Sequence, residues 1–407
     1  MILTLDLGST AAKAGLVNSR GEVVVKASVP TPQPRGDVRE VDPSAWWTAA
    51  VEAVRALDVR WPVETVVLCG FMHTLVGLDD EGAAVGPAVL MGDSRTEQAS
   101  AAAADCARRI AAWAEREPEA AARVKTYLTP KDYLRFRLTG QPATDLYDIT
   151  GAGRPEQAPR ILAPGEVAGA VTGEAAAILG LRAGTPVLTG SGDWLANLVG
   201  TAAALPERLC LYLGTSAAVG AFLSTADMAG LRDPRCFAAA ADSGTVLERS
   251  LRMLFPHRRD PYAAAAQALD DSPIGAGGVT FEPYLGGTRP GQPDRRGALL
   301  GLHLGTTRAD LARAVLEGFA FWIRELTDGH PARELVLCGG GARSPVWAEL
   351  LADVLGTVVL VPEEVDAGLV GLARIADPDI PDVTARPVRG AEPDPHRVIS
   401  NRAQHRV

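Results

Sequence analysis

The sequence predicts an α/β protein built from two structurally similar domains. Strand-like and helix-like segments are mixed along the chain, which indicates sheets layered with helices. In addition, a strand, a glycine–hydroxyl–hydroxyl turn and a small apolar segment occur twice in that order, as LTLDLGSTAA at 3–12 and as LCLYLGTSAA at 209–218. The copies are roughly 200 residues apart, which is far too long for a solenoid repeat and matches the size of one domain.

The length of 407 residues agrees with two domains or more. We place the boundary near Pro206, which gives predicted domains at 1–205 and 206–376 and a C-terminal tail at 377–407. The tail contains five prolines and little hydrophobic periodicity. It is therefore expected to be extended or to pack as a loop.

The spacing of apolar residues defines the elements of the N-terminal domain. The alternating leucines of LTLDL predict a half-buried strand, GST at 8–10 a turn, and AGLV at 14–17 the returning strand. A helix is predicted at 42–57, where Asp42 can cap the first turn and Pro43 suits the first helical position. TVVLCGF at 65–71 is typical of a short buried strand, and 75–90 predicts two more strands around an acidic turn.

The C-terminal domain repeats the strand–turn–helix pattern. ELVLC at 334–338 predicts a strand, and Gly339–Ala342 a turn. Ser344 can cap the helix that follows, and Pro345 can begin it. Thr307 and Asp310 have the spacing of a capping box in front of ADLARAVLEGFAFWIREL.

Composition excludes several classes of function. The net charge of −9 argues against a nucleic-acid-binding surface, which needs a basic stripe. The five cysteines are scattered and form no Cys-x-x-Cys pair; three of them lie in strand-like runs, as expected for buried thiols in a reducing cytoplasm. The N-terminus resembles no signal peptide, and no apolar run is long enough to cross a membrane. We therefore expect a soluble, cytoplasmic protein that binds neither nucleic acid nor membrane.

The two turns have the chemistry of a polyphosphate clamp. A strand that ends in such a turn offers backbone amides and hydroxyls to an anion. Asp6, at the end of the first strand, is placed to reach a hydrated Mg²⁺, and Lys13 would supply a positive charge. Each feature alone has a simpler explanation. The turn at 8–10 also fits a plain hairpin, Asp6 a hydrogen-bonding turn residue, and Gly339–Ala342 an ordinary glycine loop. Their combination with the internal copy indicates the superfamily of sugar kinases, actin and heat-shock chaperones.

Within that superfamily the chain resembles the FGGY family of carbohydrate kinases, and especially its xylulokinase-like members. The resemblance runs from Met1 to about Ala376. It rests on ordered matches that include TLDLGSTAAKAGLV, EVDPSAWWTAAVEA, GFMHTLVGLDDEG, LTPKDYLRFRLTG, GSGDW, LYLGTSAAV and LCGGGARSPVWAELL. The resemblance implies two ribonuclease-H-like (actin-like ATPase) domains with a cleft between them.

The resemblance also implies the reaction and its residues. The family uses ATP and Mg²⁺ to phosphorylate a hydroxyl of a sugar or polyol. Asp193, in GSGDW, corresponds to the family's general base, and Asp6 would hold Mg²⁺ through water. The residues implied at the phosphates are Gly8, Ser9, Thr10, Lys13, Gly214 and Thr215, those facing adenine are Gly340, Gly341 and Ala342, and those lining the sugar pocket are Met72, His73, Asp93 and Trp194.

The chain departs from the family pattern around the sugar. Met91 and Gly92 stand where xylulokinases have Trp and Asn, and Trp194 replaces the amide that commonly follows the base. About thirty residues of the family's insert are also missing after Gln98. We therefore expect a small ketose or polyol other than D-xylulose as the substrate. The alternative is a non-catalytic, nucleotide-binding relative with a regulatory role. Family relatives are often dimers, so a homodimer is possible.

Overall fold

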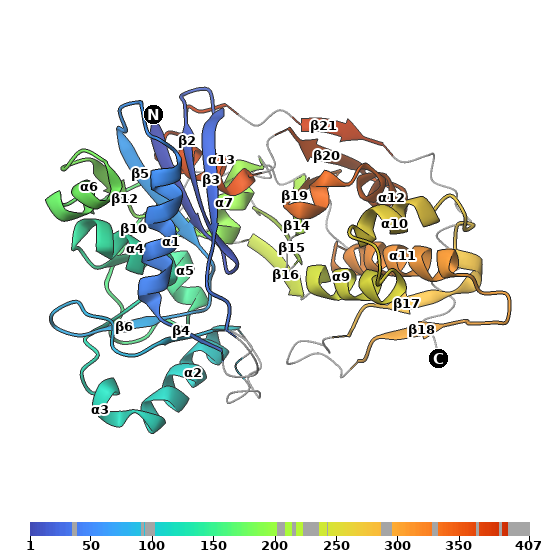
Figure 1. The fold of residues 1–407 in the computed structure, drawn as a ribbon, viewed down its shortest axis with the longest axis horizontal. Coiled ribbons are helices and arrows are strands. Elements are labelled where there is room, and N and C mark those ends of the chain that lie inside the picture. Colours follow the sequence, from blue (N-terminus) through green and yellow to red (C-terminus); the bar gives the residue numbers. More distant parts are fainter. Residues whose placement is uncertain are drawn as a thin grey trace. The chain divides into compact units, whose positions relative to one another are not determined.

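Figure 1 shows the fold in a computed structural model. The structure describes residues 1–34, 39–90, 93, 102–201, 208–213, 217–222, 236–241, 243–285, 295–327, 333–363, 366–381 and 385–389. Three sequence predictions lie outside these residues: the boundary at Pro206, Gly214 and Thr215 in the second phosphate turn, and most of the C-terminal tail.

The chain folds as two compact units. The first unit includes Met1–Ala202 and Asp366–Val383, and the second includes Ala203–Leu223, Cys236–Val365 and Thr384–Val407. The sequence assigned residues up to 376 to the second domain, whereas the segment that begins at Asp366 packs with the first unit. The physical reason is a backbone contact between the helices at 193–200 and 367–376, which Gly200 and Gly371 make possible.

A mixed sheet forms the centre of the first unit. Its strand order is β11-β12-β5-β1-β2-β3, with β13 beside β5. The strands β1 and β5 are parallel, and β2 is antiparallel to both β1 and β3. The bounds are β1 Ile2–Leu7, β2 Ala11–Val17, β3 Val23–Pro30, β5 Thr65–Gly70, β11 Val167–Ala170, β12 Pro186–Leu188 and β13 Ser191–Gly192.

Helices cover the two faces of this sheet. On one face, helix α1 (Pro43–Ala56) buries Trp46 and Trp47 against the leucines of β1. On the other face, α7 (Asp193–Gly200) and α13 (Ala367–Ala376) pack together and against the sheet. The remaining elements of this unit are β4 Glu40–Val41, β6 Val76–Leu78, β7 Ala88–Val89, α2 Ala102–Arg116, α3 Pro118–Ala121, β8 Thr126–Leu128, α4 Pro130–Thr139, β9 Ala143–Asp145, α5 Leu146–Gly151, β10 Arg160–Leu162 and α6 Gly173–Leu179.

The second unit repeats the sheet of the first. Its strand order is β16-β15-β14-β19-β20-β21, so that β14, β15, β16, β19 and β20 occupy the places of β1, β2, β3, β5 and β12. The directions agree as well, because β14 is antiparallel to β15 and parallel to β19. The bounds are β14 Arg208–Leu213, β15 Ala217–Phe222, β16 Cys236–Ala241, β19 Glu334–Cys338, β20 Val358–Pro362 and β21 Ala385–Val388. Two similar α/β domains are therefore confirmed.

The other elements of the second unit include the long helix α11 (Arg308–Thr327), which buries Phe319 and Ile323 in the apolar core. Part of the predicted tail is a strand, since β21 pairs antiparallel with β20. The remaining bounds are α9 Ser243–Leu254, α10 Pro261–Ala268, η2 Ala276–Gly278, β17 Thr280–Glu282, β18 Ala298–Leu300, η3 Gly340–Arg343 and α12 Pro345–Leu355.

The helix starts read from the sequence are confirmed. Asp42 accepts a hydrogen bond from the Ser44 amide at 2.9 Å, and Ser344 accepts one from the Trp347 amide at 3.3 Å. The capping box at Thr307 is reciprocal: the Asp310 carboxylate accepts from the Thr307 amide at 2.8 Å, and the Thr307 hydroxyl accepts from the Asp310 amide at 3.2 Å. These caps satisfy amides that a helix start leaves without an intrahelical partner.

Helices α7 and α13 touch backbone to backbone. A Cβ added at Gly200 would lie 1.9 Å from the Ala367 carbonyl oxygen, and one added at Gly371 would lie 1.8 Å from that of Ala196. Only glycine leaves room for so close an approach. The contact fixes α13 to the helix that begins at Asp193, which explains why α13 belongs to the first unit although it follows β20 in the chain.

Within the described residues, no helix is long and apolar enough to span a bilayer.

Candidate active site

The first predicted phosphate turn is a tight, exposed hairpin between β1 and β2. The Gly8 amide donates to the Ala11 carbonyl at 2.9 Å, and the side chains of Ser9 and Thr10 are exposed. The side chains of Thr31 and Gln33, which follow β3, donate to the carbonyl of Ser9 at 3.0 and 2.7 Å. This support holds the turn in place while leaving its hydroxyls exposed for an anion.

Asp6 stands at the end of β1, on the face that α13 covers. It faces Lys13 across the β1–β2 ladder and Cys69 across the β1–β5 ladder. One carboxylate oxygen accepts from the Cys69 thiol at 3.4 Å, and the other lies 3.8 Å from Lys13 Nζ. Burial raises the pKa of Asp6, and Lys13 and the thiol only partly counter this effect. The carboxylate is thus poorly solvated and would gain from a cation.

Lys13 is shared between two carboxylates. Its ammonium lies 3.1 Å from Asp366, which in turn lies 2.7 Å from the ammonium of Lys26. Burial alone would lower the pKa of Lys13, but Asp6 and Asp366 outweigh burial and raise it. The side chain therefore remains a full positive charge beside the phosphate turn.

Asp193 is the first residue of α7 and directly follows β13. Its carboxylate accepts from the Trp194 amide at 2.8 Å, and Asn197 donates to its carbonyl at 2.8 Å. Burial, followed by the negative charge of Asp6, raises the pKa of Asp193 to about 7. The sheet explains why Asp6 and Asp193 come together: Asp6 pairs with Cys69, and Cys69 pairs with Ser191, so both carboxylates lie at one edge of three adjacent strands.

Met72 and His73 follow β5 at the same edge. A Cβ added at Gly192 would lie 2.8 Å from the Met72 sulfur, so Met72 packs directly against the residue before Asp193. His73 has a φ of 62° and places Nδ1 2.6 Å from the Gly151 carbonyl. Because a carbonyl only accepts, Nδ1 carries the proton, and Nε2 of the neutral ring is an acceptor.

The other two predicted sugar-pocket residues are both buried. Asp93 accepts a hydrogen bond from the Arg39 amide at 2.7 Å, which fixes one of its carboxylate oxygens. Trp194 is 8% exposed, and its indole nitrogen has no hydrogen-bond partner among the residues that the structure describes. A buried N–H without a partner is costly, so this donor would gain from a ligand oxygen.

In the second unit, the predicted adenine residues form a short 3₁₀ turn after β19. Gly339 has a φ of 78°, and a Cβ there would lie 2.7 Å from the Leu213 carbonyl oxygen. A Cβ at Gly341 would lie 2.5 Å from the Leu213 side chain, and Ala342 is buried. Gly340 belongs to the same turn. The turn therefore lies against the end of β14, from which the chain continues to Gly214.

The structure adds residues to this edge that the sequence analysis did not single out. They are Cys69 and Asn197, which contact the two aspartates, and Asp366, which pairs with Lys13. A Cβ added at Gly368 would lie 3.6 Å from Asp6. Of these residues, Asp366 had a signal in the sequence: it precedes the small-residue run AGLVGLA, and an aspartate in that position indicates a helix start.

The residues at this edge fit a cation that keeps most of its water. In the described part of the chain, no group of three or more His, Cys, Asp or Glu side chains could enclose a metal ion. A single buried carboxylate such as that of Asp6, next to a phosphate turn, is the kind of protein contact that Mg²⁺ uses when phosphates and waters complete its shell.

Comparison with known proteins gives consistent matches along the chain. The family model "FGGY family of carbohydrate kinases, N-terminal domain" matches residues 1–105, and the corresponding C-terminal model matches residues 209–377. A xylulose kinase of Escherichia coli is 31% identical over 440 residues, covering 92% of this chain and 89% of the relative. A xylulose kinase of Streptomyces rubiginosus is 31% identical over 425 residues, covering 92% and 87%.

The fold has the same relatives. The crystal structure of a xylulose kinase from Rhodospirillum rubrum superposes with a TM-score of 0.83 at 26% identity, covering 99% of this chain and 96% of that chain. Sequence and fold therefore match the same group of proteins over nearly the whole length.

Proposed function

This chain belongs to the FGGY family of carbohydrate kinases, and from that membership we propose that it transfers the γ-phosphoryl group of ATP to a small ketose or polyol, with Asp193 as general base. Phosphoryl transfer from ATP to a carbohydrate is the activity of the family.

The observation that carries this proposal is the environment of Asp193. Its carboxyl group is buried beside Asp6, and its pKa is raised to about 7. A carboxylate with an ordinary pKa is a weak base at neutral pH, whereas a group poised near 7 accepts a proton efficiently and is still ionised in part. In the reaction, the substrate hydroxyl gives its proton to Asp193 as the hydroxyl oxygen bonds to the γ-phosphorus, and the bond from that phosphorus to the departing ADP breaks. Such a base contributes roughly 10²–10⁴-fold in rate.

The other residues at this edge bind and orient. The turn at Gly8–Thr10 and the ammonium of Lys13 would hold the phosphates, with Gly214 and Thr215 supplying the matching turn. Gly340, Gly341 and Ala342 would face the adenine. Asp6 would hold Mg²⁺ through water, and that ion would neutralise charge on the phosphates. Its positive charge would also keep a larger fraction of Asp193 ionised and therefore able to act as a base.

The sugar pocket would be lined by Met72, His73, Asp93 and Trp194. Met72 offers an apolar wall, and Nε2 of His73 accepts a hydrogen bond from a hydroxyl. Trp194 offers one indole donor where the family commonly has an amide, which can both donate and accept. A substrate that relies on that amide to accept its hydroxyl proton would lose the interaction here. We therefore infer a small ketose or polyol other than D-xylulose as the preferred substrate.

The test is a screen for ADP release over a panel of pentuloses, hexuloses and polyols. The wild type is compared with Asp193→Asn, which keeps the size of the side chain, and with the exposed control Asp58→Asn. We expect at least one sugar to stimulate ADP release, a loss of about 10²-fold or more in Asp193→Asn, and full activity in the control. Turnover that is indifferent to Asp193→Asn would rule out the assigned base. Tight binding of Mg-ATP with no stimulation by any sugar would favour the non-catalytic alternative. The homodimer stays a prediction, to be tested by sedimentation.

A further inference from the structure

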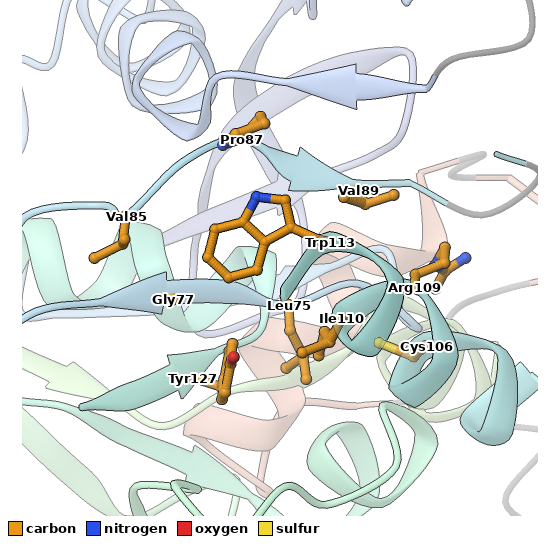
Figure 2. A pocket seen from close by; sticks show the side chains of 10 residues that line it. All are labelled: Leu75, Gly77, Val85, Pro87, Val89, Cys106, Arg109, Ile110, Trp113 and Tyr127. Carbon is orange, nitrogen blue, oxygen red and sulfur yellow. The ribbon is translucent and has the colours of Figure 1, made fainter. Parts of the chain in front are cut away.

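Helix α2 packs onto an apolar cluster that includes Leu75, which follows Met72 and His73 in the chain. Its residues Cys106, Ile110 and Trp113 pack against side chains that include Leu75 and Tyr127 (Figure 2). The cavity left between them is about 20 Å³, enough for roughly one water molecule and far too small for a sugar. Among the described residues, this region therefore offers packing support to the neighbouring turn and no space for a sugar.

Among the described residues that line this cavity, Arg109 is the charged side chain. Arg109 lies on the same helix, is 1% exposed, and lines the cavity together with Cys106 and Trp113 (Figure 2). Placing a guanidinium in apolar surroundings is strongly unfavourable unless its N–H groups find acceptors. Nη2 of Arg109 donates to the backbone carbonyl of His73. Arg109 is thus directed at the predicted sugar-binding turn.

That turn needs support, because His73 adopts an unfavourable backbone conformation. Its φ of 62° lies in the left-handed region, which a side chain other than glycine occupies only when its surroundings enforce it. The contacts that hold it include a hydrogen bond from Arg109 to the carbonyl of His73 and the Gly151 carbonyl, which lies 2.6 Å from the ring Nδ1. A Cβ added at Gly151 would lie 2.8 Å from the Met72 methyl group and 3.4 Å from His73 Cε1, so Gly151 packs against both side chains.

We propose that Arg109 is a positioning residue for substrate binding. By holding the carbonyl of His73, it keeps the ring where Nδ1–H meets Gly151, and so presents Nε2 to the substrate as a hydrogen-bond acceptor. Loss of the guanidinium lets the backbone relax toward an ordinary φ and turns the ring away. The inference rests on the proposed function in one respect, namely that His73 contacts the sugar.

The kinetic test compares Arg109→Met, which keeps the apolar stem, with Arg109→Lys, which keeps a donor. The control is Arg108→Met, at the exposed neighbouring position of the same helix. With the best sugar from the panel, we expect Arg109→Met to raise the KM for sugar about tenfold, the effect of one lost hydrogen bond of about 1.4 kcal/mol. The KM for ATP should stay within twofold, Arg109→Lys should restore part of the loss, and the control should behave as wild type.

A second measurement judges Arg109 without any turnover. The ring ¹⁵N signals of the six histidines are recorded above their pKa, and His73 is assigned by subtraction of His73→Gln. We expect His73 to carry its proton on Nδ1 in the wild type and to shift toward the Nε2–H tautomer in Arg109→Met, or in Arg109→Lys if the Met variant does not fold. An unchanged tautomer together with an unchanged KM for sugar would overturn the proposal. So would a loss that raises both KM values and lowers thermal stability together, because that pattern indicates a merely structural role. If the wild type is inactive with every sugar, the proposed function is refuted. The tautomer of His73 then tests by itself whether Arg109 positions the ring.

Discussion

The buried charge network around Lys131 gives a prediction with a definite sign. Lys131 and Arg135 on α4 share their cluster with Asp132, Asp145 and Asp148, and all five side chains are at most 1% exposed. Lys131 Nζ lies 2.5 Å from Asp132, 2.9 Å from Asp145 and 3.5 Å from Asp148. If every group were ionised, three carboxylates would face two cations, which leaves one buried negative charge without compensation.

We predict that Asp148 resolves this excess by carrying a proton at neutral pH. Burial, and then the neighbouring carboxylates, raise its pKa well above the ordinary value, although Lys131 opposes this. The hydrogen bonds agree: the Thr129 hydroxyl lies 2.8 Å from Asp132 and 2.6 Å from Asp148, but it has a single proton. If Thr129 donates to Asp132, the contact with Asp148 requires a proton on Asp148.

The perturbation is Asp148→Asn, compared with Asp132→Asn. Asparagine imitates the protonated acid in charge and can donate to Thr129 as the acid does, so we expect the Asp148→Asn variant to be at least as stable as the wild type at pH 7. Burial tends to raise the pKa of Asp132, but Lys131 and Arg135 hold it below its ordinary value. Asp132→Asn therefore removes a needed negative charge, at a cost of about 3–5 kcal/mol.

The pH dependence has the opposite sign to that of a salt-bridged aspartate. The folded protein retains the Asp148 proton above pH 4, where the unfolded chain has lost it, so this proton stabilises the fold at low pH and its contribution falls as pH rises toward the folded pKa. Relative to wild type, Asp148→Asn should gain about 1.4 kcal/mol of stability per pH unit as the pH rises from the ordinary pKa of an aspartate toward the raised pKa of folded Asp148. Urea unfolding followed by tryptophan fluorescence measures both quantities. A difference that stays flat with pH, or equal costs for the two variants, would refute the reasoning.

Three further predictions concern the site directly. Because Asp193 must be ionised to act as a base, kcat/KM should rise as pH increases through about 7. Assays of ADP release at a series of pH values should show this rise in the wild type and not in the residual activity of Asp193→Asn. Gly371→Ala should destabilise the first unit by about 3 kcal/mol or more in thermal melts, since its Cβ would meet a carbonyl oxygen at 1.8 Å, whereas Gly173→Ala, whose Cβ meets open space in the described part of the chain, should stay within about 1 kcal/mol. Trp194→Asn should raise kcat/KM for D-xylulose relative to the wild type's best sugar by about tenfold or more, and an unchanged ratio would remove Trp194 from the specificity argument.

The sequence by itself determined the local elements and the repeat. The caps at Asp42, Ser344 and Thr307 were readable because a helix start depends on side chains only a few residues away. The motif that occurs at 3–12 and again at 209–218 predicted two similar domains, because both domains begin their sheets with the same strand-and-turn sequence pattern. We identified Asp6 and Lys13 from the chemistry of the first turn and Asp193 from the family resemblance, and neither source says how these side chains pack.

Only the tertiary structure decided which of these groups act on one another. Asp6, Cys69 and Ser191 are brought into line by the pairing of three strands, and the pKa of Asp193 follows from that alignment and from burial. Asp366 reaches Lys13 from 353 residues away, because glycines let α13 press against α7. Burial and charge proximity depend on distances that are set by strand pairing and helix packing. Such contacts join residues far apart in the chain, so no local pattern in the sequence encodes them.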